Sequence, residues 1–317
     1  MTEAAMTGAG YLPHFPVRVP IPDLRPWLEG NRMPGVWSFS SPLPGPHVAL
    51  VSLMHGNEIA GALLLARWLR EGLRPLRGTL TMIFANLAAF SRFDPANPTL
   101  SRFVDEDLNR VWDDRLLKGC RHSTELARAR ALLPLMQEAD VLLDLHSMLW
   151  PSDPLMIAGD TPQSRDMALR LGTPELVVVD QGHRTGQRLI DHPIFTAPGS
   201  RRACLLVEGG PHWEPATLET LEQCATALLR ENGLLPQAPR PSRPGRLAEV
   251  TRTVIAGTHG FAFVQDFRGG TVIPARNTLL ALDGEQEIRT PHDDCLLVMP
   301  TPRAMRGHTA VRLARFA

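Results

Sequence analysis

The sequence lacks a charge bias of either sign. Lysine and arginine together number 33, aspartate and glutamate also number 33, and the formal net charge is +0. A chain without a single-sign field does not attract a polyanion or a charged membrane surface. This balance argues against a dedicated nucleic-acid binder, and we expect no nucleic-acid partner.

Long apolar runs are also missing. No stretch reaches the roughly 18 apolar residues that a membrane-spanning helix needs. The first residues, MTEAAMTGAG, have neither the basic start nor the apolar segment of a secretory leader. We therefore expect a soluble protein without a membrane partner.

Cysteine is scarce and scattered. The four cysteines form no CxxC pair; they are Cys120, Cys204, Cys224 and Cys295. Such spacing provides neither a disulfide framework nor a thiolate zinc site. It fits a reducing compartment, and we predict a cytoplasmic location.

Continuous apolar runs alternate with helical patterns over the first 232 residues. The strand-like runs are HVALVSL (47–53), TLTMIFANL (79–87), VLLDLH (141–146), ELVVVD (175–180) and ACLLVEGG (203–210). Helices are predicted over about 123–137, 162–171 and 214–231. Strands of this composition between helices are typical of an α/β protein with a mostly parallel sheet, flanked by helices.

The pattern changes near the C-terminus. Residues 233–245, GLLPQAPRPSRPG, are dense in proline and glycine and are predicted to be a linker. From 246 onward the apolar runs are short and separated by turn signals such as RGG and DG. We predict a first domain over 1–232 and a smaller antiparallel β domain over 246–317.

A histidine and a glutamate stand where the first apolar run meets a helical pattern. The segment reads His55-Gly56-Asn57-Glu58. An imidazole and a carboxylate placed this closely can share one cation, and Gly56 lets the backbone turn sharply between them. The alternative interpretation is an ordinary capped helix start.

A third nitrogen ligand follows the run VLLDL. His146 ends this predicted strand, and open α/β sheets place their sites beyond the carboxyl ends of the strands. Two histidines and a glutamate with one open position form a known catalytic zinc arrangement. Asp144, on the same strand face, is predicted to accept a hydrogen bond from a ligand, most plausibly His55. The alternative is a buried aspartate that caps a loop.

The polar segment SRFVDEDLNR (101–110) carries two arginines and an asparagine. The planar guanidiniums of Arg102 and Arg110 suit recognition of a carboxylate, and Asn109 would be an adjacent donor to the same carboxylate. The alternative is a surface loop whose arginines pair with its own acidic residues Asp105, Glu106 and Asp107.

The motifs HGNE, RFVDEDLNRVW, DLHS and LLVEGG occur in this order. On these motifs the chain resembles the succinylglutamate desuccinylase/aspartoacylase family over about residues 47–230. The resemblance implies a zinc carboxypeptidase-like α/β fold with a C-terminal β domain. By the same resemblance, the predicted first domain over residues 1–232 would be a hydrolase domain.

The resemblance also implies a role for each matching residue. His55, Glu58 and His146 would hold one Zn²⁺ per chain, although such ligands also accept Co, Mn or Ni. Arg102 would polarise the scissile carbonyl, and Asn109 and Arg110 would bind a substrate carboxylate. At the end of the last strand-like run, Glu208 would be the general base that takes a proton from the attacking water.

The chain departs from the aspartoacylase branch at two places. That branch has an arginine upstream of its catalytic glutamate to hold a second carboxylate, whereas position 198 here is proline. It also uses a late tyrosine, whereas the only tyrosine here is Tyr11. The candidates for binding the acyl group or second carboxylate are Arg184, Arg188, Arg201 and Arg202.

Together these features predict a zinc-dependent hydrolase that cleaves the amide of a small N-acyl amino acid. The resemblance leaves a homo-oligomer open. Two alternatives remain at this point: a metallocarboxypeptidase acting on short peptides, and a non-catalytic metal- or ligand-binding relative.

Overall fold

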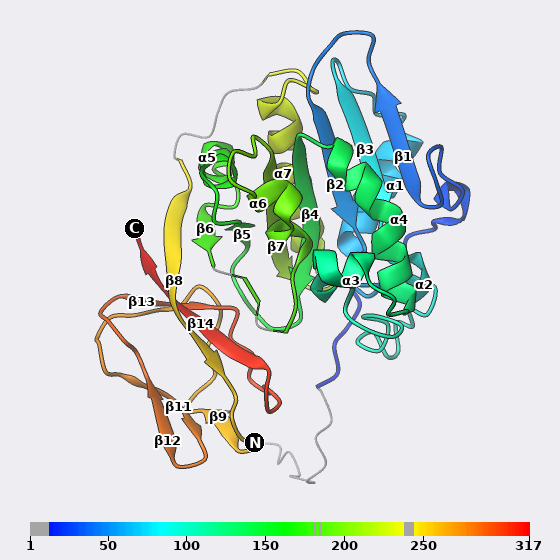
Figure 1. Cartoon of the computed structure of the whole chain (residues 1–317). Helices are drawn as coiled ribbons and strands as arrows, with labels where there is room; N and C mark the ends of the chain where they lie inside the picture. The colour runs from blue at the N-terminus through cyan, green and yellow to red at the C-terminus, as the bar shows by residue number, and fades with distance from the viewer. Residues whose placement is uncertain (1–12, 181, 184, 238–243) are drawn as a thin grey trace.

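The computed structural model describes residues 13–180, 182–183, 185–237 and 244–317. Within them, one sheet has the strand order β1-β3-β2-β4-β7-β5-β6-β8-β14-β13-β10 (Figure 1). Its strands are β1 (Val36–Ser40), β2 (His47–Ser52), β3 (Thr79–Phe84), β4 (Val141–Met148), β5 (Leu155–Ala158), β6 (Leu176–Val179), β7 (Ala203–Pro211), β8 (Arg246–Ile255), β10 (Val272–Ile273), β13 (Cys295–Val298) and β14 (Thr309–Phe316). The strands β3, β2, β4 and β7 run parallel, which confirms the predicted α/β fold class.

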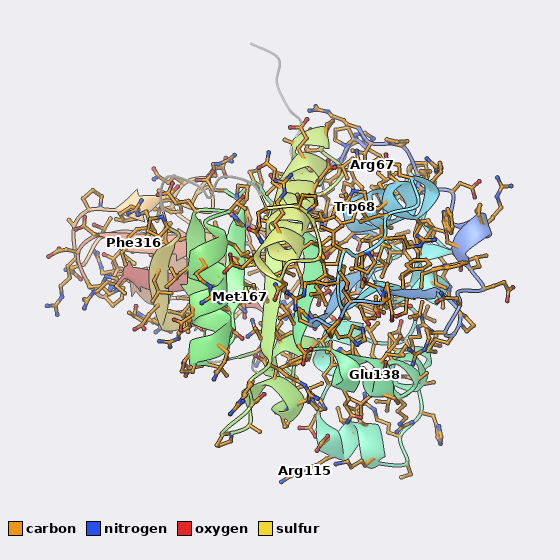
Figure 2. All side chains as sticks on the ribbon, turned by 90° about the horizontal axis from the view of Figure 1, so that it is seen from above. Arg67, Trp68, Arg115, Glu138, Met167 and Phe316 are labelled. Carbon is orange, nitrogen blue, oxygen red and sulfur yellow. The ribbon has the colours of Figure 1, made fainter. Side chains whose placement is uncertain are left out.

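Helices cover both faces of this sheet. On one face lie α1 (Ile59–Arg70), α5 (Pro162–Leu171) and α7 (Pro215–Glu231), and on the other α3 (Asp114–Lys118), α4 (Thr124–Glu138), η3 (Leu189–Asp191) and α6 (Pro193–Thr196). In Figure 2, Trp68 of α1 and Glu138 of α4 lie on opposite sides of the sheet. The short helices η1 (Arg25–Trp27), α2 (Leu87–Phe90) and η2 (Leu108–Arg110) lie in connections.

Successive side chains of β2 point to opposite faces of the sheet and so belong to two separate parts of the hydrophobic core. Val48 and Leu50 pack with α1 and α7, whereas Ala49 and Val51 pack with α4. A strand buried on both faces needs apolar residues at every position, which explains the continuous run in the sequence.

One predicted strand is too long. The run 79–87 leaves the sheet after Phe84, and Asn86 begins α2 by accepting a hydrogen bond from the backbone N–H of Ala89. The asparagine side chain offers the backbone a helix start in place of further strand pairing.

Three neighbouring strands carry the predicted site residues to one edge of the sheet. His55 follows β2, His146 lies in β4, and Glu208 lies in β7. His146 and Glu208 are register partners in the parallel ladder. The carboxyl ends of parallel strands meet at the same edge, so these side chains converge.

The C-terminal strands continue the same sheet. β8 pairs parallel with β6, and β14 pairs antiparallel with β8. A separate small sheet contains β9 (Phe261–Phe263), β11 (Leu279–Asp283) and β12 (Gln286–Arg289). The division into 1–232 and 246–317 stays a prediction, because hydrogen bonds of the main sheet cross it. Of the predicted linker 233–245, residues 238–243 lie outside the described residues.

None of the helices in the described part of the chain is long and apolar enough to cross a membrane.

Candidate metal centre and active site

The HGNE turn joins β2 to α1 and packs tightly. A Cβ at Gly56 would lie 2.4 Å from the backbone carbon of Ala89 and 2.5 Å from the carbonyl oxygen of Ser101. Glycine is therefore required here for close approach of two backbone segments. Glu58 occupies the N-cap position of α1, yet its side chain caps no backbone N–H. The alternative interpretation of HGNE as an ordinary capped helix start therefore does not explain the position of the Glu58 carboxylate.

Glu58 faces two imidazoles instead. Its Oε1 lies 2.7 Å from Nδ1 of His55, and its Oε2 lies 3.0 Å from Nδ1 of His146. All three residues are buried, and one ligand atom from each lies within 4.8 Å of the others. Ligand atoms around a tetrahedral zinc are separated by about 3.4 Å. The three predicted ligands thus meet with a spacing that a small cation fits.

The histidines strongly affect the acidity of Glu58. Burial alone would raise its pKa, but the charges of His55 and His146 outweigh burial and hold the pKa well below the usual value. The charged carboxylate therefore persists in a buried place, as a metal ligand must.

Each histidine has a carboxylate at its other ring nitrogen. Asp107 Oδ1 lies 3.0 Å from Nε2 of His55, and Asp144 Oδ2 lies 2.8 Å from Nε2 of His146. The prediction that Asp144 contacts His55 is wrong. Asp144 contacts His146 instead, and Asp107 occupies the position beside Nε2 of His55. Carboxylates at the outer nitrogens orient ligating imidazoles and raise their basicity.

Asp144 is fully buried without a well-aligned donor. Its 2.8 Å contact with His146 lacks the alignment of a hydrogen bond, and neither carboxylate oxygen has another hydrogen-bond partner among the described residues. Burial would lower the pKa of His146, but Asp144 and Glu58 outweigh it and raise that pKa well above the usual value. The carboxylates of Asp144 and Glu58 thus place negative charge around His146. This negative charge favours the binding of a divalent cation.

Arg102 contacts the ligand cluster directly. Its Nη2 lies 2.8 Å from Nε2 of His55 and 3.1 Å from Asp107, and its Nη1 lies 3.3 Å from Glu58. Burial would lower its pKa, but Asp107 and Glu58 outweigh burial and raise it. About a third of the side chain, 36%, remains exposed, so the guanidinium is reachable by a ligand.

Asn109 and Arg110 follow on the same loop. Asn109 is buried, its Nδ2 lies 3.5 Å from Nε2 of His146, and its Oδ1 accepts from the backbone N–H of Leu189 at 2.9 Å. Arg110 donates to the carbonyl of Asn109, and burial lowers its pKa to about 10. The loop 101–110 is therefore part of the site, and its acidic residue Asp107 pairs with Arg102 and with the ligand His55.

Glu208 is the carboxyl group of the site whose pKa is raised. It is buried, and its Oε2 has no hydrogen-bond partner among the described residues. Burial is the main cause that raises its pKa to about 8; Glu58 adds to the rise, and His146 and Arg102 oppose it. A carboxyl group with this pKa suits proton transfer near neutral pH.

Sequence reasoning missed a second pair that supports the ligands. The Oγ of Ser147 lies 2.6 Å from Nδ1 of His212, and the Ser147 backbone N–H donates to Oε2 of Glu58 at 3.1 Å. Next to it, the Trp213 indole donates to the Asn57 carbonyl at 2.9 Å. No spacing signal could reveal these contacts, since they join segments far apart in the chain.

The candidate arginines for a second carboxylate divide clearly. Arg201 and Arg202 precede β7, at the edge opposite Glu208, and Arg202 donates to the carbonyl of Gln137. Their proposed role is therefore wrong, because the strand carries them away from the site. Arg184 lies outside the described residues. Arg188 is buried among carboxylates close to Arg110.

Comparison with known proteins agrees with this geometry. A sequence profile of the succinylglutamate desuccinylase/aspartoacylase catalytic domain matches residues 44–230. Aspartoacylase from Xenopus tropicalis is 32% identical over 113 residues, which are 33% of this chain and 34% of that protein. N-acyl-aromatic-L-amino acid amidohydrolase (carboxylate-forming) from Xenopus laevis is 31% identical over 113 residues, 33% of this chain and 35% of that protein. The chain thus aligns with about a third of the length of these curated relatives.

Solved structures share the fold over nearly the whole chain. Succinylglutamate desuccinylase from Vibrio cholerae has a TM-score of 0.69 at 19% identity, covering 90% of this chain and 86% of that one. The ectoine utilization protein from Ruegeria pomeroyi, solved with product bound, has a TM-score of 0.65 at 15% identity, covering 88% of each chain. The profile covers more than half of the sequence, and the clustered residues His55, Glu58 and His146 lie within the matched range. This chain therefore belongs to the succinylglutamate desuccinylase/aspartoacylase family.

Proposed function

We propose that this protein is a zinc-dependent hydrolase that cleaves the amide bond of a small N-acyl amino acid. One observation carries the proposal: Glu208, a buried residue with a pKa of about 8 whose Oε2 has no hydrogen-bond partner among the described residues, lies in register with His146 of the His55–Glu58–His146 cluster. The two curated relatives above are named for a deacylase and an amidohydrolase, which supports the same class of reaction.

The donor set supports one zinc ion per chain. Two imidazoles and one carboxylate leave a coordination position open, as catalytic zinc sites do. When bound, the metal would polarise the scissile carbonyl and lower the pKa of water. Imidazole and carboxylate also accept Co, Mn or Ni, so the identity of the metal is part of the proposal.

The residues around the cluster would divide the remaining work. Glu208 would take a proton from the attacking water and deliver it to the leaving amine. Arg102 would place positive charge where the carbonyl oxygen becomes negative, since its guanidinium is partly exposed beside Glu58. Asn109 and Arg110 would bind the carboxylate of the amino acid.

Glu208 supports an enzyme over a binding protein. A buried carboxyl group without a donor costs free energy that a purely structural site has no reason to carry. In a hydrolase the same group is a proton acceptor held away from competing donors. A cytoplasmic location is also part of the proposal, supported by four cysteines that form no disulfide.

The test is metal analysis of the wild type beside His55→Ala and His146→Ala, with release of free amine measured on a panel of N-acyl amino acids. We expect near one zinc per chain and turnover of at least one substrate, with both lost in the variants. Exposed His259→Ala is the matched control and should retain both. A wild type that binds no metal would overturn the proposal.

A further inference from the structure

The loop 101–110 carries site residues but is not fixed by packing of its own side chains. Its residues at the site are Arg102, Asp107, Asn109 and Arg110. Between α2 and η2 the described chain forms no helix or strand, and none of residues 102–107 is buried. A segment with little buried apolar surface opens easily unless other bonds hold it. Its position beside the metal ligands therefore depends on hydrogen bonds.

One buried side chain, Glu125, accepts the N–H groups of this loop. Glu125 stands in the first turn of α4 and is 0% exposed. Its Oε1 accepts from the backbone N–H of Val104 at 2.6 Å. Its Oε2 accepts from the backbone N–H groups of Asp105 at 3.0 Å and Glu106 at 3.2 Å. Consecutive backbone donors of the loop thus end on a single carboxyl group.

A further donor links the same carboxyl group to the central sheet. Nδ2 of Asn86 donates to Oε1 of Glu125 at 3.0 Å, and Asn86 caps α2 directly after β3 (Figure 1). β3 pairs in parallel with β2, the strand that leads to His55. Glu125 therefore connects the loop to the part of the sheet that positions a proposed metal ligand.

The loop and the start of α4 also bind each other through more exposed groups. Oδ2 of Asp105 accepts from the backbone N–H of Thr124 at 2.7 Å, and Glu106 pairs with Arg121. Exposed pairs of this kind contribute little, whereas a buried acceptor that is lost leaves its donors unpaired. Glu125 is therefore the main polar attachment of the segment 104–106.

Site residues flank the attached segment on both sides. Arg102 precedes Val104 by two residues, and its carbonyl accepts from the backbone N–H of Gly56 at 3.0 Å. Asp107 follows Glu106 directly and faces Nε2 of His55 at 3.0 Å. A displacement of 104–106 would therefore move the guanidinium of Arg102 and the carboxylate of Asp107 relative to the metal ligands.

The partners of Glu125 explain why a carboxylate is needed at this position. All of them are N–H donors, and a carboxylate offers acceptor oxygens on both sides. Glutamine has the same shape, but its NH₂ group would face N–H donors on one side. Buried donors left without an acceptor cost free energy, which the loop can avoid by moving away.

We propose that Glu125 is a positioning residue of the active site. It fixes the loop 101–110, and through the loop it places Asp107 against His55 and Arg102 beside the metal ligands. Its effect on hydrolysis rests on the proposed function. Its attachment of the loop does not, and can be measured without turnover.

The test is a double-substitution cycle on zinc affinity. Competition with a chromophoric chelator is measured for the wild type, Glu125→Gln, Asp107→Asn and the double variant. We expect Glu125→Gln alone to weaken zinc binding by roughly 3- to 10-fold. When Asp107 is already replaced, the further loss should be less than about twofold, because both changes act on His55 through one contact. Equal losses in the two backgrounds, or no loss in the first, would overturn the inference.

Asp283→Asn is the matched control for a loss of stability. Asp283 of β11 also accepts from consecutive backbone N–H groups, those of Gly257 at 2.6 Å and Thr258 at 2.9 Å. Its replacement removes a similar acceptor from another part of the fold and should leave zinc affinity unchanged. A loss of affinity equal to that of Glu125→Gln would show a general destabilisation and would also overturn the inference.

Hydrogen exchange tests the attachment in the metal-free wild type, so it does not depend on how well a variant folds. The amides of Val104, Asp105 and Glu106 should exchange at least about 10²-fold more slowly than in an unfolded chain, although the loop is exposed. Glu125→Gln should remove this protection while α4 keeps its own. Rapid exchange of these amides in the wild type would contradict the attachment.

Kinetics at saturating zinc measure the effect on hydrolysis. On any substrate that the wild type hydrolyses, Glu125→Gln should lower kcat/KM by roughly 10- to 100-fold, because Arg102 is displaced from the reacting carbonyl. An unchanged kcat/KM would overturn the positioning role. If the wild type hydrolyses nothing on the panel, the proposed function fails alone, since zinc affinity and hydrogen exchange still decide the role of Glu125.

Discussion

The histidine cluster and the arginine cluster are assembled in opposite ways. His55 and Glu58 follow β2, Asp144 and His146 lie in the adjacent parallel strand β4, and the spacings of three and two residues are local. Arg110, Arg188 and Arg312 come from three segments that meet only through packing of the loop 185–191 and strand β14. The residues proposed to bind the metal thus lie at the carboxyl ends of the parallel strands, whereas the arginines lie on segments around them.

The substitution Glu208→Gln tests the proposed proton acceptor beside the histidine cluster and has the largest expected effect. Removing the proton acceptor should lower kcat/KM by about 10²–10⁴-fold while zinc content stays near that of the wild type. Steady-state kinetics and metal analysis of the same preparation measure both quantities. Glu219→Gln, an exposed glutamate of α7, should behave as wild type. A metal-loaded Glu208→Gln variant with full activity would remove Glu208 from the mechanism.

The acidity of Glu208 predicts a pH dependence of stability in the metal-free protein. Its folded pKa is about 8 and its ordinary value is 4.5, so the folded state keeps a proton that the unfolded state releases between these pH values. Stability should therefore fall as pH rises through this window. Glu208→Gln should be more stable than wild type by several kcal/mol, on the order of 5, above pH 8 and by little near pH 4.5. Denaturant unfolding of both chelated proteins measures this, and a pH-independent difference would contradict it.

Asp107→Asn weakens the outer support of the histidine cluster. Because Asp107 faces Nε2 of His55, its loss should weaken zinc affinity by about 10- to 100-fold. Competition with a chromophoric chelator gives the affinity. Asp266→Asn, an exposed aspartate in the C-terminal region, is the control and should leave it unchanged. Unaltered affinity in Asp107→Asn would mean that Asp107 serves Arg102 alone.

The substitution Trp213→Phe tests a hydrogen bond that supports the HGNE turn, and its expected effect on stability is the smallest of the four. The indole donates to the Asn57 carbonyl inside the HGNE turn, so phenylalanine keeps most of the packing and loses one buried donor. We expect a loss of about 1–2 kcal/mol in stability. Trp150→Phe, a half-buried tryptophan that packs edge-on against Phe15, is the comparison variant. Chemical denaturation reports the difference, and equal effects of the two variants would show that the hydrogen bond contributes nothing.

Much of the sheet could be predicted from continuous apolar runs, because a strand covered on both faces must be apolar throughout. The runs 141–146 and 203–210 correspond to β4 and β7, and the helix expected over 162–171 is α5. The end of β3 was placed too late, since Asn86 captures the backbone for α2. The continuation of the sheet through β8 was also not predicted, because β6 and β8 pair across the predicted linker.

The sequence by itself determined the proposed ligand cluster: His55 and Glu58 are joined by a turn that only Gly56 permits, and His146 lies near the carboxyl end of the buried strand β4. Local spacing and strand direction are enough to bring such groups together. Only the tertiary structure decided that Asp107 contacts His55, that Arg201 and Arg202 lie at the edge opposite Glu208, and that Arg312 pairs with Asp180. These relations depend on which strands pair and how far each extends beyond its neighbour, and no local pattern encodes that.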